Sequence, residues 1–463
     1  MPTDQDPSAA PTRRWVIAVY AAAVLVRLAV AVSFGAQPPV IADAQDYDRL
    51  AVGLLQTGSY LTTSGELSSL RPPLYPLVVA GVYFLAGEGN FVAVALLQAA
   101  ISLVTMVVVH RMAAQLAGPW VGLTAAAMFG FYPSHLAFNA LLLSETLFSC
   151  LFLVAVWASL RLVQGPRIGA AVLLGLALGF GALTRSILWT CAPPLLLYLL
   201  VASQSPWRLR IRDLGVTALL FAVVLAPWAW RNTRVHQTFT LVDVMGGRNV
   251  MMGNYEHTPL ERSWATVTDV TGDRAWYRVL AETQPDGLNG LTQGQIDKLA
   301  MKYGIRYFFS HPVQTLQRCV VRFFNFWQLD RTIVAGLQQG LWGDVPKWGL
   351  ATAVVVFSGS YVVLILSAIF GFFASRFPWR VQLLMLLWIA LPCAIHTIAF
   401  AHSRYHQPLV PILAIYAAVA LAAWRWPDQW SPQRAWWPTL ILGSLLALGW
   451  LRELLMVDLQ LFQ

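Results

Sequence analysis

The chain has 463 residues, of which 57% are hydrophobic and 11% are charged, with a formal net charge of +9. A soluble domain carries roughly 25% charged residues, so this composition excludes an ordinary soluble protein. Many of the arginines lie in short loops beside apolar runs, which favours membrane topology and lipid phosphate over nucleic acid as the reason for the positive charge. The apolar runs are about 17–25 residues long, the length that crosses hydrocarbon as a helix, and they lack the alternating polarity of barrel strands. The sequence therefore predicts an all-α polytopic membrane protein.

In chain order, we expect a cytoplasmic tail at 1–14 and then about 11–13 transmembrane helices. An N-terminal transmembrane module at 15–230 contains a first external loop at 35–89. A large external loop at 231–347 follows, and C-terminal transmembrane helices occupy 348–463. The candidate spans are 15–34, 90–110, 120–134, 143–160, 168–184, 187–203, 214–230, 348–374, 381–400, 407–424 and 436–452.

Basic residues set the expected orientation of these spans. Arginines gather in every second loop, and the positive-inside rule makes those loops cytoplasmic. They are Arg13, Arg14, Arg111, Arg161, Arg167, Arg208, Arg210, Arg212, Arg376, Arg380, Arg425 and Arg434. The N-terminus is then cytoplasmic, and a bacterial inner membrane is the expected location. The apolar segment 74–87 would reverse every later loop if it crossed the membrane, so we expect an external juxtamembrane or partly inserted helix there.

The second half of the large external loop has helical patterns. Thr292 and Gln295 have the spacing of a capping box, and an apolar stripe at helical spacing follows them. His311-Pro312 should end this helix and begin another, because proline is tolerated in a first turn. The second helix combines an apolar, aromatic side with Arg318 and Arg322 on another side, which is typical of an interfacial helix.

A cluster of acids follows the first span, which is unusual in so apolar a chain. Asp43, Asp46 and Asp48 lie within six residues, and Arg71 follows, fixed by the two prolines after it. Carboxylates suit a general base, and a guanidinium suits a phosphate. The alternatives are solvated loop charges, or three carboxylates that could hold Mg²⁺ or Mn²⁺. Spacing alone does not choose which acid would be the base.

Other ionisable side chains lie at the expected external ends of spans. Glu145 and Arg185 are candidates for acceptor binding and phosphate contact, with a buried hydrogen-bonding pair and snorkelling as their structural alternatives. Arg404 is a second candidate phosphate contact. Arg231 and Asn232 could bind substrate or anchor a helix end. His396, His402 and His406 invite a zinc interpretation, but their spacing is irregular and no carboxylate accompanies them.

Several motifs, taken in order, resemble the membrane glycosyltransferases of the GT-C fold. Specifically, they are similar to the dolichyl-phosphate-mannose–protein mannosyltransferase and aminoarabinose transferase branch. The motifs span roughly residues 15–425 and comprise Asp43-x-x-x-Tyr47, Arg71-Pro72-Pro73-Leu74-Tyr75-Pro76, the segment from Asn139 to Phe148 with Glu145, Gly181-Ala-Leu-Thr-Arg185, Ala226-Pro227-Trp228-Ala-Trp-Arg231-Asn232 followed by Gly253-Asn254, and Arg404-Tyr405-x-x-Pro408-Leu-Val-Pro411.

The resemblance implies that Asp43 is the base that activates the acceptor and that Arg71 contacts the phosphate of the donor. The other substrate-binding residues that it implies are Tyr47, Tyr75, Glu145, Arg185, Arg231, Asn232, Arg404 and Tyr405. Leu70 stands where the aminoarabinose branch has a second acid, and Asp46 stands where it has a basic residue. These departures leave the substrate of that branch, and any metal held by those acids, open.

The sequence thus predicts an inverting glycosyltransferase that takes a sugar from a polyprenyl-phosphate donor at the external membrane face. The acceptor could be a lipid, a glycan or a protein, and no nucleic acid is expected as a partner. The alternatives are a glycolipid transporter or flippase, and a polymerase or ligase of surface polysaccharide. Transporters favour paired broken helices and charges at the midplane, whereas the charges here lie at helix ends.

Overall fold

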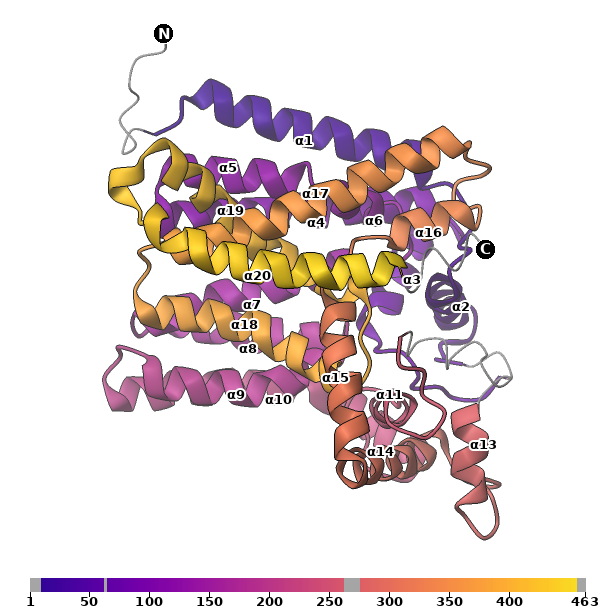
Figure 1. Cartoon of the computed structure of the whole chain (residues 1–463). Helices are drawn as coiled ribbons and strands as arrows, with labels where there is room; N and C mark the ends of the chain where they lie inside the picture. The colour runs from indigo at the N-terminus through magenta and orange to yellow at the C-terminus, as the bar shows by residue number, and fades with distance from the viewer. Residues whose placement is uncertain (1–9, 62–64, 262–274, 456–463) are drawn as a thin grey trace.

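The computed structural model describes residues 10–61, 65–261 and 275–455, and within these ranges all regular elements are helices. Each predicted span corresponds to one helix of a bundle (Figure 1). The bundle helices are α1 (Arg13–Phe34), α4 (Phe91–Ala117), α5 (Pro119–Gly130), α7 (Glu145–Gln164), α8 (Ile168–Ala182), α9 (Ile187–Ala202), α10 (Trp207–His236), α17 (Lys347–Ala374), α18 (Trp379–Ile398), α19 (Val410–Arg425) and α20 (Pro432–Glu453).

Six of these helices are long and apolar enough to cross a membrane by themselves, within the described part of the chain. They are α1, α4, α7, α17, α18 and the segment Ser403–Arg425, which contains α19. The others run alongside them but are shorter or carry more polar residues. α10 continues beyond the predicted end at 230 to His236, where Gln237 adopts a left-handed conformation and stops it. The expected polytopic all-α fold is thereby confirmed.

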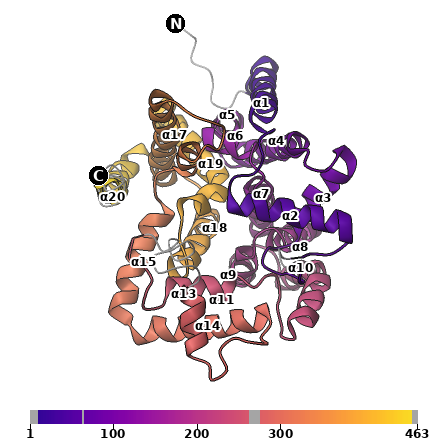
Figure 2. The same cartoon turned by 90° about the vertical axis from the view of Figure 1, so that its right-hand side faces the viewer.

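The remaining helices gather mostly at one end of the bundle (Figures 1 and 2). At that end lie α2 (Ala42–Thr57), α3 (Leu74–Ala86), α11 (Gly246–Gly253), α13 (Ala275–Glu282), α14 (Gln293–Ser310), α15 (Pro312–Phe326) and α16 (Thr332–Gln338). Both predicted external loops therefore meet at the same end. α3 has 13 residues and would extend about 20 Å, which is too short to cross the hydrocarbon core upright.

The helices of the large loop begin and end as their sequence indicates. Thr292 and Gln295 form the predicted capping box at the start of α14, and Pro312 begins α15 directly after His311. The basic side of α15 is turned into the protein, because Arg318 and Arg322 are buried. Its apolar side is exposed at Val313, Leu316, Val320 and Phe323.

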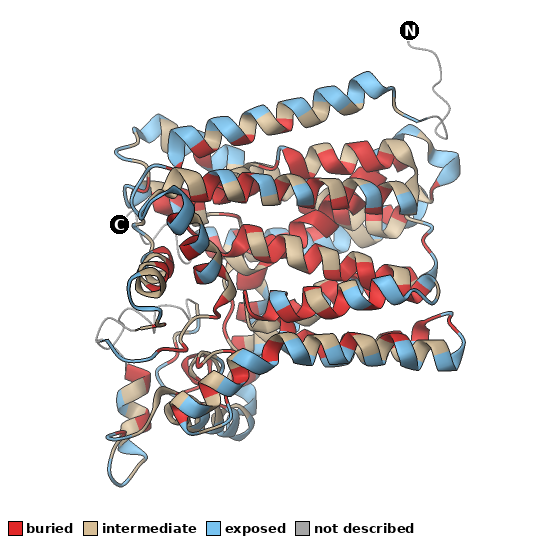
Figure 3. Cartoon of the chain, turned by 180° about the vertical axis from the view of Figure 1, so that it is seen from behind, coloured by how far each residue is buried: buried red, intermediate tan, exposed pale blue. Residues whose placement is uncertain are grey.

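The bundle has a graded interior (Figure 3). α1 is exposed along most of its length, whereas α19 is buried along nearly all of it. α17 packs so closely on α19 that a Cβ added to Gly371 would lie 1.8 Å from the carbonyl oxygen of Tyr416. This tight packing fixes the position of α19, and the short helix η1 (Ser403–Leu409) leads directly into it.

Candidate active site

Seven ionised side chains form a chain of alternating charge in the region where α2, α7 and η1 meet. In order they are Arg49, Asp46, Arg71, Asp43, Arg404, Glu145 and Arg185. We call this set the charge chain. Each acid contacts two arginines, and the arginines outnumber the acids by one. The charge chain thus has a positive excess, which suits the binding of an anion.

The first half of the charge chain is built on α2. Arg71 Nη2 lies 2.5 Å from Asp43 Oδ1 and 3.0 Å from Asp46 Oδ2. Arg49 Nη2 donates to the other Asp46 oxygen at 2.6 Å. Asp43 lies in the first turn of α2, where the helix dipole favours a negative charge. Arg71 is held by Pro72 and Pro73, which lead directly into α3.

The second half joins three distant segments. Glu145 is the first residue of α7, Arg185 lies between α8 and α9, and Arg404 lies in η1. Arg185 Nη1 and Arg404 Nε each lie 2.8 Å from Glu145 Oε1. The Glu145 side chain is only 2% exposed, and without these two cations its burial as a carboxylate would be very costly. Arg404 also contacts Asp43 Oδ2, so Asp43 is held on both oxygens.

These contacts determine the protonation state of Asp43. Burial opposes its ionisation, but the Arg404 and Arg71 guanidiniums outweigh burial and hold the pKa of Asp43 well below its usual range. Burial likewise disfavours the charged form of Arg71, yet Asp43 beside it raises the pKa of Arg71 above its ordinary value. Asp43 is therefore a carboxylate over the whole neutral range, and it is a weak base as long as both arginines remain in place.

Aromatic side chains surround the charge chain. The Tyr47 and Tyr75 rings pack edge to face with centroids 4.9 Å apart, and Arg71 lies over the Tyr47 ring at 5.8 Å. The hydroxyls of Tyr47 and Ser144 are hydrogen-bonded at 3.2 Å. Arg185 lies over the Tyr405 ring at 5.5 Å. Tyr47, Tyr75 and Tyr405 thus shape the walls around the ions.

The three acids of the first external loop do not converge on one point. Asp43 and Asp46 share Arg71, whereas Asp48 is turned away and accepts a hydrogen bond from the Tyr83 hydroxyl at 2.6 Å. Within the described ranges, no group of three or more His, Cys, Asp or Glu side chains could hold a metal ion. The geometry does not fit the Mg²⁺ or Mn²⁺ site that the spacing had suggested.

The histidines do not form a zinc site either. His396 bonds to the carbonyl of Phe400, and its ring stacks on Tyr405 at 4.1 Å. His406 bonds to the carbonyl of Phe326, and His402 accepts from the backbone N–H of Arg404. The stacking of His396 holds the Tyr405 ring in place, and the hydrogen bond to His402 holds the backbone that carries Arg404.

Arg231 and Asn232 contact the first external loop and the Val242 backbone rather than the charge chain, and their assignment as substrate-binding residues stays a prediction. Arg231 Nη1 donates to the Ser68 carbonyl at 2.6 Å and to the Ser69 hydroxyl at 2.8 Å. Asn232 accepts from the Ser69 hydroxyl at 2.8 Å and donates to the Val242 carbonyl at 2.9 Å. Through these contacts to Ser68 and Ser69, Arg231 and Asn232 position the segment that leads to Arg71.

Sequence reasoning missed Asp243, which lies between α10 and α11 near Arg71 and Ser186. Burial raises the pKa of Asp243 to about 6. The only sequence signal was one acid among apolar residues in Leu241-Val242-Asp243-Val244. It belongs to no motif.

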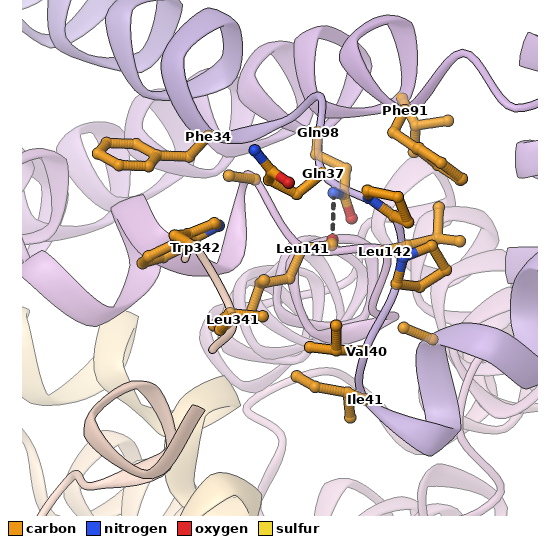
Figure 4. Close-up of a pocket in the computed structure, with 15 residues that line it drawn as sticks. Phe34, Gln37, Val40, Ile41, Phe91, Gln98, Leu141, Leu142, Leu341 and Trp342 are labelled. Atoms are coloured by element: carbon orange, nitrogen blue, oxygen red, sulfur yellow. Dashed lines mark hydrogen bonds between the residues drawn. The ribbon is translucent and has the colours of Figure 1, made fainter. Parts of the chain in front are cut away.

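Two cavities lie next to a residue of the charge chain or to one of its sequence neighbours. The first, of about 430 Å³, has no ionisable residue in its lining and includes Ala44, the residue after Asp43 (Figure 4). It is lined by Phe34, Gln37, Pro38, Pro39, Val40, Ile41, Ala44, Phe91, Val94, Gln98, Ala140, Leu141, Leu142, Leu341 and Trp342. The second, of about 360 Å³, lies among α7, α9 and α18. Apart from Arg185 and His396, its walls are mainly apolar and include Phe148, Leu188 and Pro392.

Comparisons with known proteins agree with this architecture. A family model described as dolichyl-phosphate-mannose-protein mannosyltransferase matches residues 70–230, a segment that includes Arg71, Glu145 and Arg185. The lipid A galacturonosyltransferase RgtD from Rhizobium johnstonii is 25% identical over 172 residues, which are 36% of this chain and 35% of that protein.

Two solved structures share the overall fold. One is ArnT from Cupriavidus metallidurans bound to undecaprenyl phosphate, with a TM-score of 0.51 and 16% identity over 96% of this chain and 66% of ArnT. The other is the archaeal oligosaccharyltransferase AglB from Archaeoglobus fulgidus in complex with an inhibitory peptide and a dolichol-phosphate. Its TM-score is 0.51, with 14% identity over 94% of this chain and 56% of AglB. The chain thus spans less than two thirds of the length of either protein. The predicted resemblance is confirmed, and the chain has the fold of the GT-C glycosyltransferases.

Proposed function

We propose that this protein is a membrane glycosyltransferase that moves a sugar from a polyprenyl-phosphate donor to an acceptor hydroxyl, with inversion. Reaction at the external face of a bacterial inner membrane is supported by the arginine distribution and by the position of the charge chain at the end of the bundle that carries α2, α3 and α11. The observation that carries the proposal is the position of Asp43. It lies between two guanidiniums, in a fold shared with proteins that bind lipid phosphates.

The arginines of the charge chain are suited to a phosphate. Arg71 and Arg404 carry planar guanidiniums that stay partly accessible, with side chains 19% and 16% exposed. Guanidinium groups bind phosphate oxygens through paired hydrogen bonds. A phosphodiester brings one negative charge and can replace a carboxylate as their partner.

This exchange of partners would activate the base. As long as Arg71 and Arg404 hold both oxygens of Asp43, its proton affinity is low. When the donor phosphate draws the two guanidiniums toward itself, Asp43 loses part of this stabilisation and becomes more basic. Donor binding therefore precedes activation of the acceptor, which limits the reactivity of Asp43 in the absence of donor.

The reaction is a single displacement. Asp43 accepts the proton of the acceptor hydroxyl while the acceptor oxygen forms a bond to the anomeric carbon. The bond between that carbon and the phosphate oxygen breaks, and its electron pair leaves with the lipid phosphate. Arg71 and Arg404 stabilise the charge that develops on the leaving phosphate. Because attack and departure occur on opposite faces, the anomeric configuration inverts.

The two cavities suggest where each substrate lies. The cavity among α7, α9 and α18 combines apolar walls with Arg185 at the charge chain, which suits a polyprenyl chain ending in a phosphate. The lining of the cavity of Figure 4 includes Ala44, the residue after Asp43, and no ionisable residue, which favours an acceptor with an apolar part over a charged peptide. Whether the sugar is a hexose or a pentose is a separate question.

The competing functions predict different fates for a labelled donor. Protein reconstituted in vesicles would be given a panel of polyprenyl-phosphate sugars, labelled in the sugar, together with a membrane lipid extract, a glycan or a peptide as acceptor. We expect the label to leave the donor and appear on an acceptor. Label that only crosses the bilayer would indicate a flippase, and transfer that requires a diphosphate-linked oligosaccharide would indicate a polymerase or ligase.

A further inference from the structure

Asp243 lies in a segment whose backbone is fixed on both sides. The Val242 carbonyl accepts from Trp228 Nε1 at 2.8 Å and from Asn232 Nδ2 at 2.9 Å. The Val244 N–H donates to the Ser69 carbonyl at 3.1 Å. Val242 and Val244 are buried, whereas Asp243 between them is partly exposed. The segment therefore holds one carboxyl in a defined position between two buried neighbours.

The surroundings of this carboxyl connect it to both halves of the charge chain. Its hydrogen-bond partners are the Ser186 hydroxyl, next to Arg185, and the Met245 N–H, which lies 3.3 Å from Oδ1. The negative charge of Asp297 and the positive charge of Arg71 also act on it, with opposite effects on its pKa. Asp243 forms no ion pair with an arginine, lysine or histidine in the part of the chain that the structure describes.

An acid with this position is poorly suited to contact the phosphate itself, because a carboxylate repels a phosphate. A carboxyl group is, however, a strong partner for sugar hydroxyls. The sugar of a polyprenyl-phosphate donor is attached directly to a phosphate oxygen, so a phosphate held by Arg71 leaves the sugar close to the arginine. Burial raises the pKa of Asp243, so its carboxyl can both donate and accept hydrogen bonds near neutral pH.

We propose that Asp243 binds hydroxyl groups of the donor sugar and contributes to the choice of sugar. This inference rests on the proposed function. It also gives the Arg231-Asn232 pair a role as positioning residues. These two side chains bind Ser69, which leads to the phosphate-binding Arg71, and Asn232 also binds Val242, which precedes the sugar-binding Asp243.

The test compares Asp243→Asn with a control, Asp213→Asn. Asp213 in α10 is also an acid that accepts a backbone N–H, at 3.0 Å from Arg167, but it pairs with Arg212 and does not belong to the charge chain. The probes are undecaprenyl phosphate without a sugar and undecaprenyl phosphate carrying glucose, galactose, mannose or arabinose. Binding of each lipid would be measured on protein in nanodiscs, and transfer would be measured with a membrane lipid extract as acceptor.

We expect Asp243→Asn to lower kcat/KM for the preferred donor roughly 10- to 100-fold, since a buried polar contact to the sugar is lost. Discrimination between donor sugars should narrow, and the Kd for undecaprenyl phosphate should stay within about twofold of wild type. Asp213→Asn should change none of these values by more than about twofold.

The inference would be overturned if Asp243→Asn weakened the binding of sugar-bearing and sugar-free lipid equally. It would also be overturned if the variant discriminated between donor sugars as well as wild type does. The same donor-specific loss in Asp213→Asn would overturn it as well. If the wild-type protein binds each sugar-bearing lipid no more tightly than the sugar-free lipid, the role of Asp243 is contradicted but the proposed function is not. If it neither binds nor consumes any of these lipids, the proposed function fails as well.

Discussion

Two sets of arginines in this protein differ in the groups to which they bond. Arg71, Arg185 and Arg404 pair with carboxylates at the end of the bundle, and their side chains are 16–19% exposed. Arg27, Arg231 and Arg322 bond mainly to backbone carbonyls and uncharged side chains. The first set can exchange one anion for another, because its partners are carboxylate side chains and its own side chains are partly exposed. The second set stabilises the fold by joining segments that are distant in the sequence.

Arg27 and Arg322 illustrate the second set. Arg27 is fully buried within α1 and donates to the Gly130 carbonyl at 2.8 Å and to the Ser102 hydroxyl at 3.1 Å. Arg322 in α15 donates to the Ile398 carbonyl at 2.8 Å and also contacts the Gly253 carbonyl. Burial lowers the pKa of Arg322 to about 10, and it remains a cation at neutral pH. The comparison teaches that the partner of an arginine, more than its burial, indicates whether it can serve a substrate.

The largest effect should follow from Asp43→Asn. This change keeps the shape of the side chain but removes the base, so we expect transfer to fall by roughly 10²- to 10⁴-fold. Arg71 and Arg404 lose a competing carboxylate, so the Kd for undecaprenyl phosphate should be equal to or lower than that of wild type. Turnover and lipid binding on the same preparation check both statements. A variant with near-wild-type turnover would remove Asp43 from the mechanism.

The contrast between the two sets can be tested with matched conservative changes, Arg71→Lys and Arg231→Lys. Lysine keeps the charge but loses the planar fork of donors. We expect Arg71→Lys to lower kcat/KM roughly 100-fold, because this contact is strengthened as the phosphate leaves. Arg231→Lys should lower it only a few-fold, through a less well-held loop. Equal losses in kcat/KM would abolish the distinction between the two sets.

Arg322→Gln should act on stability rather than on chemistry. Loss of the guanidinium leaves buried carbonyls without a donor and should lower the free energy of unfolding by about 1–3 kcal/mol. Thermal unfolding in detergent measures this change, and kcat per folded molecule should stay near that of wild type. A large loss of kcat without a change in unfolding temperature would instead place Arg322 in the first set.

The smallest effect should be that of Asp48→Asn. Asp48 contacts Tyr83 and lies outside the charge chain, so we expect kcat/KM to change by less than about threefold. Transfer measured with and without added Mg²⁺ or Mn²⁺ provides the check. A severe loss that a divalent metal partly rescues would restore the three-carboxylate metal site.

Local patterns predicted the helices because hydrophobic length and capping residues act over a few positions. The capping box at Thr292 and the new helix at Pro312 are examples. The acids of α2 and Arg71 were also identifiable, because they stand out in an apolar chain. The resemblance to known motifs, rather than spacing, singled out Asp43.

The assembly of the site could not be predicted from local patterns, because its contacts join distant segments. Asp43 and Arg404 are separated by 361 residues, and no periodicity relates them. Arg231 has the same residue type as Arg404 in a similar helix-end position, so only the fold reveals that it faces Ser68 and Ser69. The position of Asp243 also depends on distant contacts, because Asn232 and Trp228 hold the carbonyl of its neighbour Val242.

The central claim is that a lipid phosphate takes over the arginines that hold Asp43. A cryo-EM structure of the wild-type protein in nanodiscs with undecaprenyl phosphate tests it most directly. We predict that the phosphate lies within hydrogen-bonding distance of the Arg71 and Arg404 guanidiniums and that at least one Asp43 oxygen is released. A phosphate bound elsewhere, with Asp43 still paired to both arginines, would contradict the account.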